Sequence, residues 1–365
     1  MTRIINQVAV FGLGKVGELV AVMLEESGFK VVGYDAAPHD DLGFEVKALD
    51  VNDRAALRDS LRGVDAVVSC LPFHLNIEVA EAAYDSSVHY FDLTEDVPTT
   101  NRVIELAAEQ LATGRPGAAF APQCGLAPGL IGIIGASIAK TFEEIRSIEL
   151  KVGALPQNPT GLLGYAINWS PEGVVNEYLN DCEVVRSGNR QMVPAMTGKE
   201  RVLIGGIELE AALTSGGLGT MCETYEGRVH RLDYKTLRYP GHFDQMHFLF
   251  DELNLREQRE LVGSMLVASK PPVNDDVVFV HAAVEGRKNG HPFRENYVRA
   301  YKPLNISGRV WRAISWTTAA SVVSVVELVA DGSLPQSGFI KQEDITLEAL
   351  FSTQAGLHFA AEGEV

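Results

Sequence analysis

Cysteine is scarce in this chain. Only four of its 365 residues are cysteines, and none forms a C-x-x-C pair or a zinc-type spacing with histidine. This pattern argues against a disulfide-stapled secreted scaffold and against a structural metal site. We therefore expect free thiols in a reducing, cytoplasmic compartment and no bound metal. The four positions are Cys70, Cys124, Cys182 and Cys222.

Positive charge and long apolar runs are also in short supply. The chain has 31 lysine and arginine residues against 48 aspartate and glutamate residues, a net charge of −17. A surface of that sign repels nucleic acid and anionic membranes, so we expect neither as a partner. The apolar stretch 126–138 is too short and too rich in glycine to span a bilayer, and the first residues lack the apolar core of a signal peptide.

What the chain does contain is a glycine-rich turn after a short apolar run, residues 8–11, and before a helix-forming segment, residues 18–27. Its three glycines have the spacing G-x-G-x-x-G. The first permits a sharp turn, the second lets the backbone approach a pyrophosphate, and the third lets the helix pack on the strand. A glycine turn without a ligand is the alternative. The predicted pyrophosphate-binding residues are Gly12, Gly14, Lys15, Val16 and Gly17, at a helix N-terminus that favours anions.

An acid follows at the expected distance. The second apolar run, residues 29–34, ends at Asp35. A carboxylate there accepts hydrogen bonds from the adenosine ribose hydroxyls and repels a 2′-phosphate, which predicts NAD rather than NADP as the cofactor. The alternative is a strand-end acid that faces water. Asp50, at the end of the next apolar run, is a candidate for an adenine contact or for a helix N-cap.

Strands and helices alternate through the first third of the chain, which predicts an α/β fold with a doubly wound parallel sheet of the Rossmann type. Ligands of such sheets lie at the carboxyl ends of the strands. The candidates there for the nicotinamide side are Cys70, Leu71, Pro72, Asp92 and Leu93, although plain turn and cap roles are open for each. The predicted strands are 8–11, 29–34, 44–50, 66–69, 90–93 and 118–121, and the predicted helices 18–27, 53–62, 75–86 and 102–113.

The pattern changes at a Gly/Pro-rich hinge after residue 123. We predict a Rossmann domain over 1–123 and an α+β catalytic and dimerisation domain with a mixed or antiparallel sheet over 124–309. A helix and tail over 310–365 should pack back on the first domain. Strand candidates in the second domain are 147–152, 208–212, 230–232 and 276–283, and helix candidates are 130–140, 257–264 and, returning, 310–331.

Two further polar stretches are candidates for chemistry, although cap, packing or surface roles are open for each side chain. In the first, Ser170 and Pro171 have the types preferred at a helix start, and Glu172 lies in the first turn. The second stretch, residues 232–242, brings together cations, tyrosines and a histidine. On a strand its Lys235 faces the opposite side from Arg238, which can bind a carboxylate bidentately, and His242 can relay protons near neutral pH.

These motifs together resemble the saccharopine dehydrogenase-like reductases over nearly the whole chain, and most closely the lysine 6-dehydrogenase branch. One position departs from the saccharopine reductases, which carry an aspartate where Ala127 stands, and this favours the lysine branch. The stretches that carry the resemblance are residues 12–17, 88–93, 125–129, 170–173, 214–217, 233–242 and 317–320.

The resemblance implies an NAD-dependent oxidative deamination of L-lysine at its ε-amino group, which gives 2-aminoadipate 6-semialdehyde that cyclises to a piperideine carboxylate. It implies that Asp92 or His242 takes protons, that Arg238 or Lys235 holds the α-carboxylate, and that Glu172 holds the α-ammonium. It also implies a homodimer or a dimer of dimers. The alternatives are a reductase of the saccharopine or carboxynorspermidine dehydrogenase type and a nucleotide-binding regulator without turnover.

Overall fold

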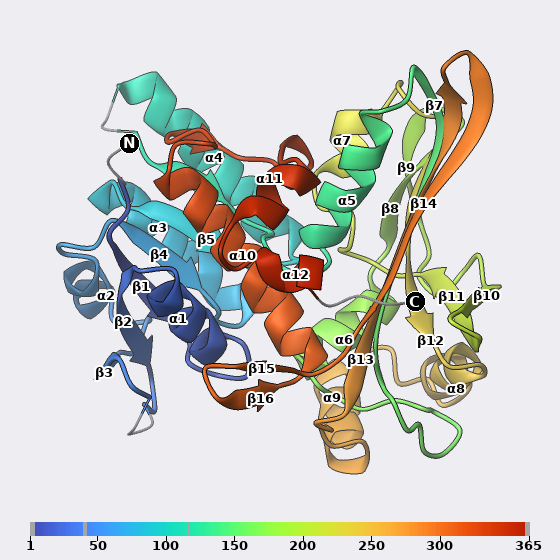
Figure 1. The fold of residues 1–365 in the computed structure, drawn as a ribbon. Helices are drawn as coiled ribbons and strands as arrows, with labels where there is room; N and C mark the ends of the chain where they lie inside the picture. The colour runs from blue at the N-terminus through green and yellow to red at the C-terminus, as the bar shows by residue number, and fades with distance from the viewer. Residues whose placement is uncertain (1–3, 39–41, 115–116, 362–365) are drawn as a thin grey trace. The chain divides into compact units, whose positions relative to one another are not determined.

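The computed structural model describes residues 4–38, 42–114 and 117–361. The chain divides into two compact units (Figure 1). The first unit comprises Met1–Leu130 and Ser315–Ala361, and the second is built on Ile131–Ile314. The boundaries expected from the sequence, at 123/124 and 309/310, fall a few residues earlier.

Among the described residues of the first unit, seven strands form one parallel sheet in the order β17-β6-β5-β4-β1-β2-β3. The chain starts in the middle of the sheet at β1 and winds outward first to β2 and β3, then to β4, β5 and β6. This is the predicted doubly wound α/β arrangement, with its switch point between β1 and β4. The strands are β1 Gln7–Phe11, β2 Lys30–Asp35, β3 Glu45–Ala48, β4 Ala66–Ser69, β5 His89–Asp92, β6 Ala119–Ala121 and β17 Gly338–Phe339.

Apolar side chains of these strands and their crossover helices form the core of the first unit, with Val67, Tyr90 and Phe120 fully buried. Figure 1 shows the red C-terminal elements among the blue and cyan ones of this unit. The helices here are α1 Gly17–Glu26, α2 Arg54–Ser60, the 3₁₀ turns η1 Phe73–Leu75 and η3 Gln342–Asp344, α3 Asn76–Ser86, α4 Val97–Thr113, α11 Leu347–Ser352 and α12 Leu357–Ala361.

Two helix starts differ from the sequence prediction, as their cap residues show. Asp53, not Asp50, caps α2, because its carboxylate accepts from the backbone N–H groups of Ala55 and Ala56 at 3.0 and 3.1 Å. Helix α4 begins at Val97, five residues before the predicted start, because Asp96 caps it and proline in the first turn needs no amide partner.

Helix α10, Ala313–Ala330, is the one described helix that is long and apolar enough to cross a membrane, but 94% of it is buried inside the protein. It is therefore a core helix. Glu327 ties it into the first unit, since one carboxylate oxygen accepts from the Ser27 hydroxyl at 2.9 Å and the other from the Gln354 N–H at 2.8 Å. The C-terminal segment thus returns to the first unit.

The second unit contains a mixed sheet, as predicted. Its path is β10-β11-β12-β7-β13-β14, with β8 pairing both β12 and β9, and only the β12–β7 pair is parallel. The strands are β7 Glu144–Pro156, β8 Cys182–Arg186, β9 Asn189–Val193, β10 Glu200–Ile204, β11 Ile207–Leu213, β12 Arg231–Arg238, β13 Asp276–Lys288 and β14 His291–Tyr301, and a separate hairpin consists of β15 Leu304–Ile306 and β16 Arg309–Trp311.

An apolar cluster that includes Tyr178, Leu237 and Phe243 forms a core of the second unit. The long strands β7 and β13 run well beyond the predicted segments 147–152 and 276–283, since their polar residues continue the same antiparallel pairing, with a register shift between Glu285 and Gly286. The helices here are α5 Leu130–Ala139, α6 Pro171–Leu179, α7 Met221–Tyr225, α8 His242–His247, the π-helical turn η2 Phe248–Glu252 and α9 Arg259–Ser269.

Candidate functional site

The glycine turn between β1 and α1 has the geometry of a phosphate cradle. Gly12 has φ +84°, a left-handed conformation that suits glycine. A Cβ on Gly17 would lie 1.8 Å from the Gly12 carbonyl oxygen, so only glycine lets α1 pack this closely. A Cβ on Gly14 would meet no atom within 4 Å, which leaves open space where a pyrophosphate can approach. The exposed Lys15 and half-buried Val16 complete the turn.

Asp35 ends β2 and is bonded to this cradle. One carboxylate oxygen accepts from the Leu13 N–H at 2.8 Å, and the other accepts from the Ala37 N–H at 2.9 Å. The side chain is half-buried, so it keeps access to solvent. A dinucleotide fits this arrangement, because the cradle offers space and backbone for phosphates and the carboxylate offers an acceptor for ribose hydroxyls.

The end of β4 lies beside the glycine turn, at the switch point. The Cys70 N–H donates to the Phe11 carbonyl oxygen at 2.8 Å, and a Cβ on Gly12 would come within 3.0 Å of Cys70 and Leu71 atoms. Pro72 is exposed at the start of η1. The structure thus brings two of the predicted cofactor-side residues, Cys70 and Leu71, to the turn. Burial raises the pKa of the Cys70 thiol to about 12, which keeps the thiol protonated.

Asp50 follows β3 on the surface. Its carboxylate accepts from the backbone and side-chain N–H groups of Asn52, at 3.0 and 2.8 Å, and these bonds lower its pKa. Of the two roles considered for Asp50, an adenine contact and a helix N-cap, the N-cap role belongs to Asp53 instead.

Asp92, at the end of β5, is completely buried and fully engaged. Its Oδ1 accepts from the N–H groups of Thr94 and Gln123, both at 2.9 Å, and its Oδ2 accepts from the Tyr90 hydroxyl at 2.7 Å. Burial raises the pKa of this carboxyl to about 6. Asp92 therefore fastens the carboxyl ends of β5 and β6 and holds Gln123 at φ +65°, while the next residue, Leu93, is half-buried.

Arg238, the last residue of β12, lies at the centre of a buried polar cluster in the second unit. Its Nε donates to the Tyr178 hydroxyl at 2.7 Å, one Nη to the Leu237 carbonyl oxygen at 2.9 Å, and the other Nη to Glu177 at 3.3 Å. The guanidinium also lies 4.6 Å from the ring centre of Tyr165. A guanidinium has five N–H groups, so two stay without a partner among the described residues.

His242 closes this cluster, and its bonds determine its tautomer. The Leu163 carbonyl oxygen, 2.9 Å from Nδ1, can only accept, so Nδ1 carries the proton and Nε2 accepts from the Tyr178 hydroxyl at 2.9 Å. Burial and the nearby Arg238 charge lower the pKa of His242 to about 3. The imidazole thus stays neutral near pH 7, which corrects the expectation of a titrating proton relay. It orients Tyr178 instead.

The structure does not bring Lys235 or Glu172 into this cluster. The Lys235 ammonium donates to the Gly198 carbonyl oxygen at 2.6 Å and to Glu200 at 2.8 Å, on the other face of β12. Glu172 is exposed in the first turn of α6, where it accepts from the Ser170 hydroxyl at 3.2 Å. As expected, Ser170 caps that helix, accepting from the Gly173 N–H at 3.0 Å.

Three members of the cluster were missed as candidates from the sequence: Tyr165, Glu177 and Tyr178. Helical spacing contained a signal for one of them, because Val174 and Tyr178 lie four apart and form the buried face of α6. Nothing in the spacing links α6 to β12, some 60 residues later. Among the described residues, no group of three or more His, Cys, Asp or Glu side chains is placed to hold a metal ion.

The strand order, the glycine cradle and Asp35 define a dinucleotide-binding α/β protein. Two family descriptions match the chain: "Saccharopine dehydrogenase NADP binding domain" over residues 8–115 and "Saccharopine dehydrogenase C-terminal domain" over residues 125–354. The chain belongs to the saccharopine dehydrogenase family. The first match supports a nicotinamide cofactor, but its description names NADP, whereas the sequence predicts NAD.

Individual relatives are more distant. A saccharopine dehydrogenase [NADP(+), L-glutamate-forming] from Schizosaccharomyces pombe is 29% identical over 151 residues, which cover 39% of this chain and 31% of the relative. The alignment thus spans about a third of that curated relative. The structure of apo saccharopine dehydrogenase (L-Glu forming) from Saccharomyces cerevisiae superposes with a TM-score of 0.77 at 16% identity, covering 97% of both chains. A DAP dehydrogenase from C. glutamicum reaches 0.50 at 12% identity, with 99% of both chains covered. At these identities the two structures establish the fold.

Proposed function

We propose that this chain is an NAD-dependent oxidoreductase that deaminates L-lysine at its ε-amino group. In the balanced reaction, L-lysine, NAD⁺ and water give 2-aminoadipate 6-semialdehyde, ammonium, NADH and a proton. The observation that carries the proposal is the buried Arg238 guanidinium, two of whose N–H groups have no partner among the described residues, in a chain that also has a dinucleotide cradle.

The choice of NAD rests on Asp35. Its carboxylate is held by the Leu13 and Ala37 N–H groups, so it cannot turn away from the cradle without losing both bonds. A fixed negative charge there attracts ribose hydroxyls and repels a 2′-phosphate. Residues 36–38, which follow it directly, contain no cation to neutralise such a phosphate.

The choice of an α-amino acid rests on Arg238. Two of its N–H groups stay without a described partner, and a substrate carboxylate satisfies both in the bidentate geometry that arginine favours. Glu177, 3.3 Å from the guanidinium, offers a counter-charge that suits an α-ammonium beside that carboxylate. The amine donor itself is supported by Ala127, where the saccharopine reductases carry an aspartate.

The other residues of the cluster then act by positioning the Arg238 guanidinium. His242 accepts the Tyr178 hydroxyl proton, so the phenol oxygen presents its lone pairs to Arg238 and holds the guanidinium in place. Since His242 is neutral, it adds no charge that competes with Arg238 for the substrate. Bound NAD supplies the hydride acceptor, and water attacks the iminium carbon of the oxidised substrate to release ammonium. We also propose a homo-oligomer and a cytoplasmic location, both of which stay predictions from the sequence.

The test is NADH absorbance on mixing the purified protein with NAD and L-lysine. Growth of the signal without a keto acid supports the proposal. A signal that requires saccharopine supports the second candidate, a saccharopine dehydrogenase, which the Schizosaccharomyces pombe relative favours. No signal with L-lysine, saccharopine or carboxynorspermidine, with either NAD or NADP, contradicts both and favours a regulator. Arg201→Met, at an arginine that is 80% exposed, is the matched control for Arg238→Met.

A further inference from the structure

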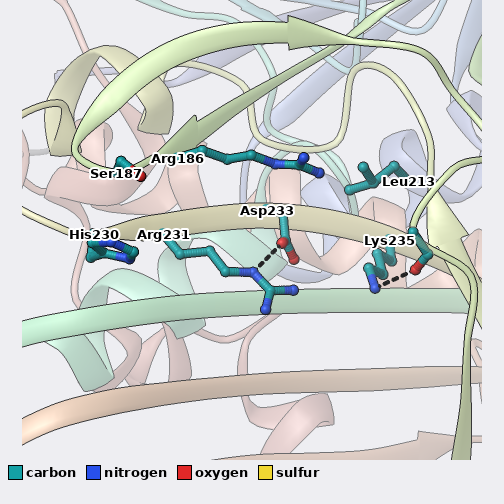
Figure 2. Close-up of a pocket in the computed structure, with 8 residues that line it drawn as sticks. Arg186, Ser187, Leu213, His230, Arg231, Asp233 and Lys235 are labelled. Carbon is teal, nitrogen blue, oxygen red and sulfur yellow. Dashed lines mark hydrogen bonds and ion pairs between the residues drawn. The ribbon is translucent and has the colours of Figure 1, made fainter.

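The second unit contains a pocket that the proposed reaction does not use. It has a volume of about 420 Å³ and lies where β8 pairs with β12, so we call it the β8–β12 pocket. Charged side chains dominate its lining (Figure 2): Arg186 at the end of β8, and Arg231, Asp233 and Lys235 along β12. Asp233 and Lys235 face the opposite side of β12 from Arg238, so the pocket is separate from the Arg238 cluster.

Two arginines line this pocket from neighbouring strands, Arg186 on β8 and Arg231 on β12. Arg186 and Arg231 are directly opposite each other in the antiparallel register of β8 and β12. Like charges in that position repel each other. Arg231 has two acidic partners, since its Nε donates to Asp233 at 2.7 Å and one Nη lies 3.8 Å from Glu149. The exposed Arg186 side chain has no hydrogen bond or ion pair with any residue in the described ranges. Arg186 is therefore available to bind an anion.

Asp233, in contrast, lacks a hydrogen-bond donor for one of its carboxylate oxygens. It is only 3% exposed, and its Oδ1 is a buried atom that finds no hydrogen-bond donor in the described part of the chain. A buried carboxylate oxygen without a donor is costly, and such atoms in native proteins call for a partner. Lys235 does not serve, because its ammonium is committed to Gly198 and Glu200. The pocket thus lacks one acceptor and one donor at the same time.

We propose that the β8–β12 pocket binds a small α-amino acid. A carboxylate on Arg186 and Arg231 offsets their mutual repulsion, and an ammonium donates to the Asp233 Oδ1. A simple anion would face the unsatisfied Asp233 oxygen, and a simple amine would leave Arg186 unpartnered. Only a molecule with both groups a few bonds apart satisfies both. The proposal does not rest on the proposed reaction, because none of these side chains belongs to the Arg238 cluster or to the cradle.

The experiment is ligand-observed saturation-transfer NMR on the full chain without NAD. The probes are L-alanine, propionate, which lacks the ammonium, and ethylamine, which lacks the carboxylate. We expect L-alanine to bind and the other two to bind at least about tenfold more weakly, as the loss of a charged hydrogen bond predicts. Equal binding of propionate, or no L-alanine signal, overturns the proposal.

Variants assign the signal to the pocket. Arg186→Met and Asp233→Asn should each weaken L-alanine binding about tenfold or more, and Arg201→Met should leave it unchanged. Arg186 is exposed, so its variant keeps the test valid if Asp233→Asn folds poorly. An L-alanine signal that survives Arg186→Met but disappears in Arg238→Met belongs to the Arg238 cluster and refutes the pocket. Because the assay measures binding without turnover, its outcome is independent of whether L-lysine is oxidised.

Discussion

The most direct test of the cofactor assignment is the substitution Asp35→Asn. The two carboxylate oxygens of Asp35 hold the Leu13 and Ala37 N–H groups at 2.8 and 2.9 Å. Asparagine has one oxygen acceptor. Since Leu13 is buried and Ala37 is exposed, we expect the amide oxygen to keep the Leu13 bond, with the amide nitrogen toward water. The turn should therefore keep its shape while the negative charge is removed.

The expected effect follows from the value of that charge. Hydrogen bonds to a charged group contribute about 1.5–3 kcal/mol, against about 1 kcal/mol for neutral ones. Two ribose hydroxyls that bind an amide instead of a carboxylate thus lose about 1 kcal/mol each. The resulting 2 kcal/mol corresponds to an increase of about 30-fold in Kd for NAD. Binding of NADP should not weaken in parallel, because its 2′-phosphate is no longer repelled.

The assay is a titration of NAD and of NADP into the protein, followed by intrinsic fluorescence, with Kd compared between variant and parent. The control is Asp59→Asn, which removes one negative charge from an exposed ion pair on α2 and should leave both affinities unchanged. If the NAD to NADP preference is the same in Asp35→Asn and in the parent, the carboxylate does not select the cofactor and the argument for NAD fails.

Five other substitutions test the remaining assignments. Gly17→Ala places a methyl group 1.8 Å from a backbone oxygen and should lower the free energy of unfolding by about 3 kcal/mol in urea titrations, whereas Gly14→Ala meets no atom within 4 Å and should keep Tm while weakening NAD binding. Arg238→Met should reduce kcat/KM for L-lysine about 100-fold through KM, and an unchanged KM would contradict a carboxylate receptor. For His242, whose pKa is lowered to about 3, stability is present above pH 6.5 and lost as pH falls toward 3, so His242→Gln should remove about 2 kcal/mol of the loss in unfolding free energy between pH 7 and pH 5. The pKa of Asp92 is raised from 3.8 to about 6, so its contribution to stability is present below pH 3.8 and is lost as pH rises through 6. Asp92→Asn should therefore remove a loss in unfolding free energy on the order of 3 kcal/mol over that pH range. For either variant, a pH profile of stability like that of the parent would refute the pKa.

The sheet of the first unit was predictable because its signals are local. The central parallel strands are short apolar runs bounded by turn residues, and β4 runs from Ala66 to Ser69 as expected. Caps were less predictable, since Asp50 and Asp53 both precede α2 and only backbone geometry decides which carboxylate meets the free N–H groups. Strand β17 of the tail pairs with β6 at the edge of the sheet, and the apolar helix before it was the signal from which a returning tail was expected.

The Arg238 cluster could not be predicted from local sequence patterns. Tyr178 and Arg238 are 60 residues apart, and their bond depends on how α6 packs on the sheet. A side chain that caps or packs locally leaves a signature within a turn or two, whereas a buried network across elements leaves none. That is why Glu172, with its conspicuous place in a helix start, was selected from the sequence, while the buried Glu177 on the same helix contacts the arginine.

The strand β12 shows why a run of conspicuous residues need not form one site. Its side chains alternate between two faces, so Arg238 joins Tyr178 and His242 while Asp233 and Lys235 line the β8–β12 pocket. Residues 233–242 were grouped because they are close in sequence, but neighbouring residues of a strand point to opposite faces of the sheet. The two groups also differ in what they lack, because the cluster has two spare N–H donors and the pocket has both a spare guanidinium and a spare carboxylate oxygen. We therefore expect substitutions at odd-numbered positions of β12 to affect the β8–β12 pocket and substitutions at even-numbered positions to affect the Arg238 cluster.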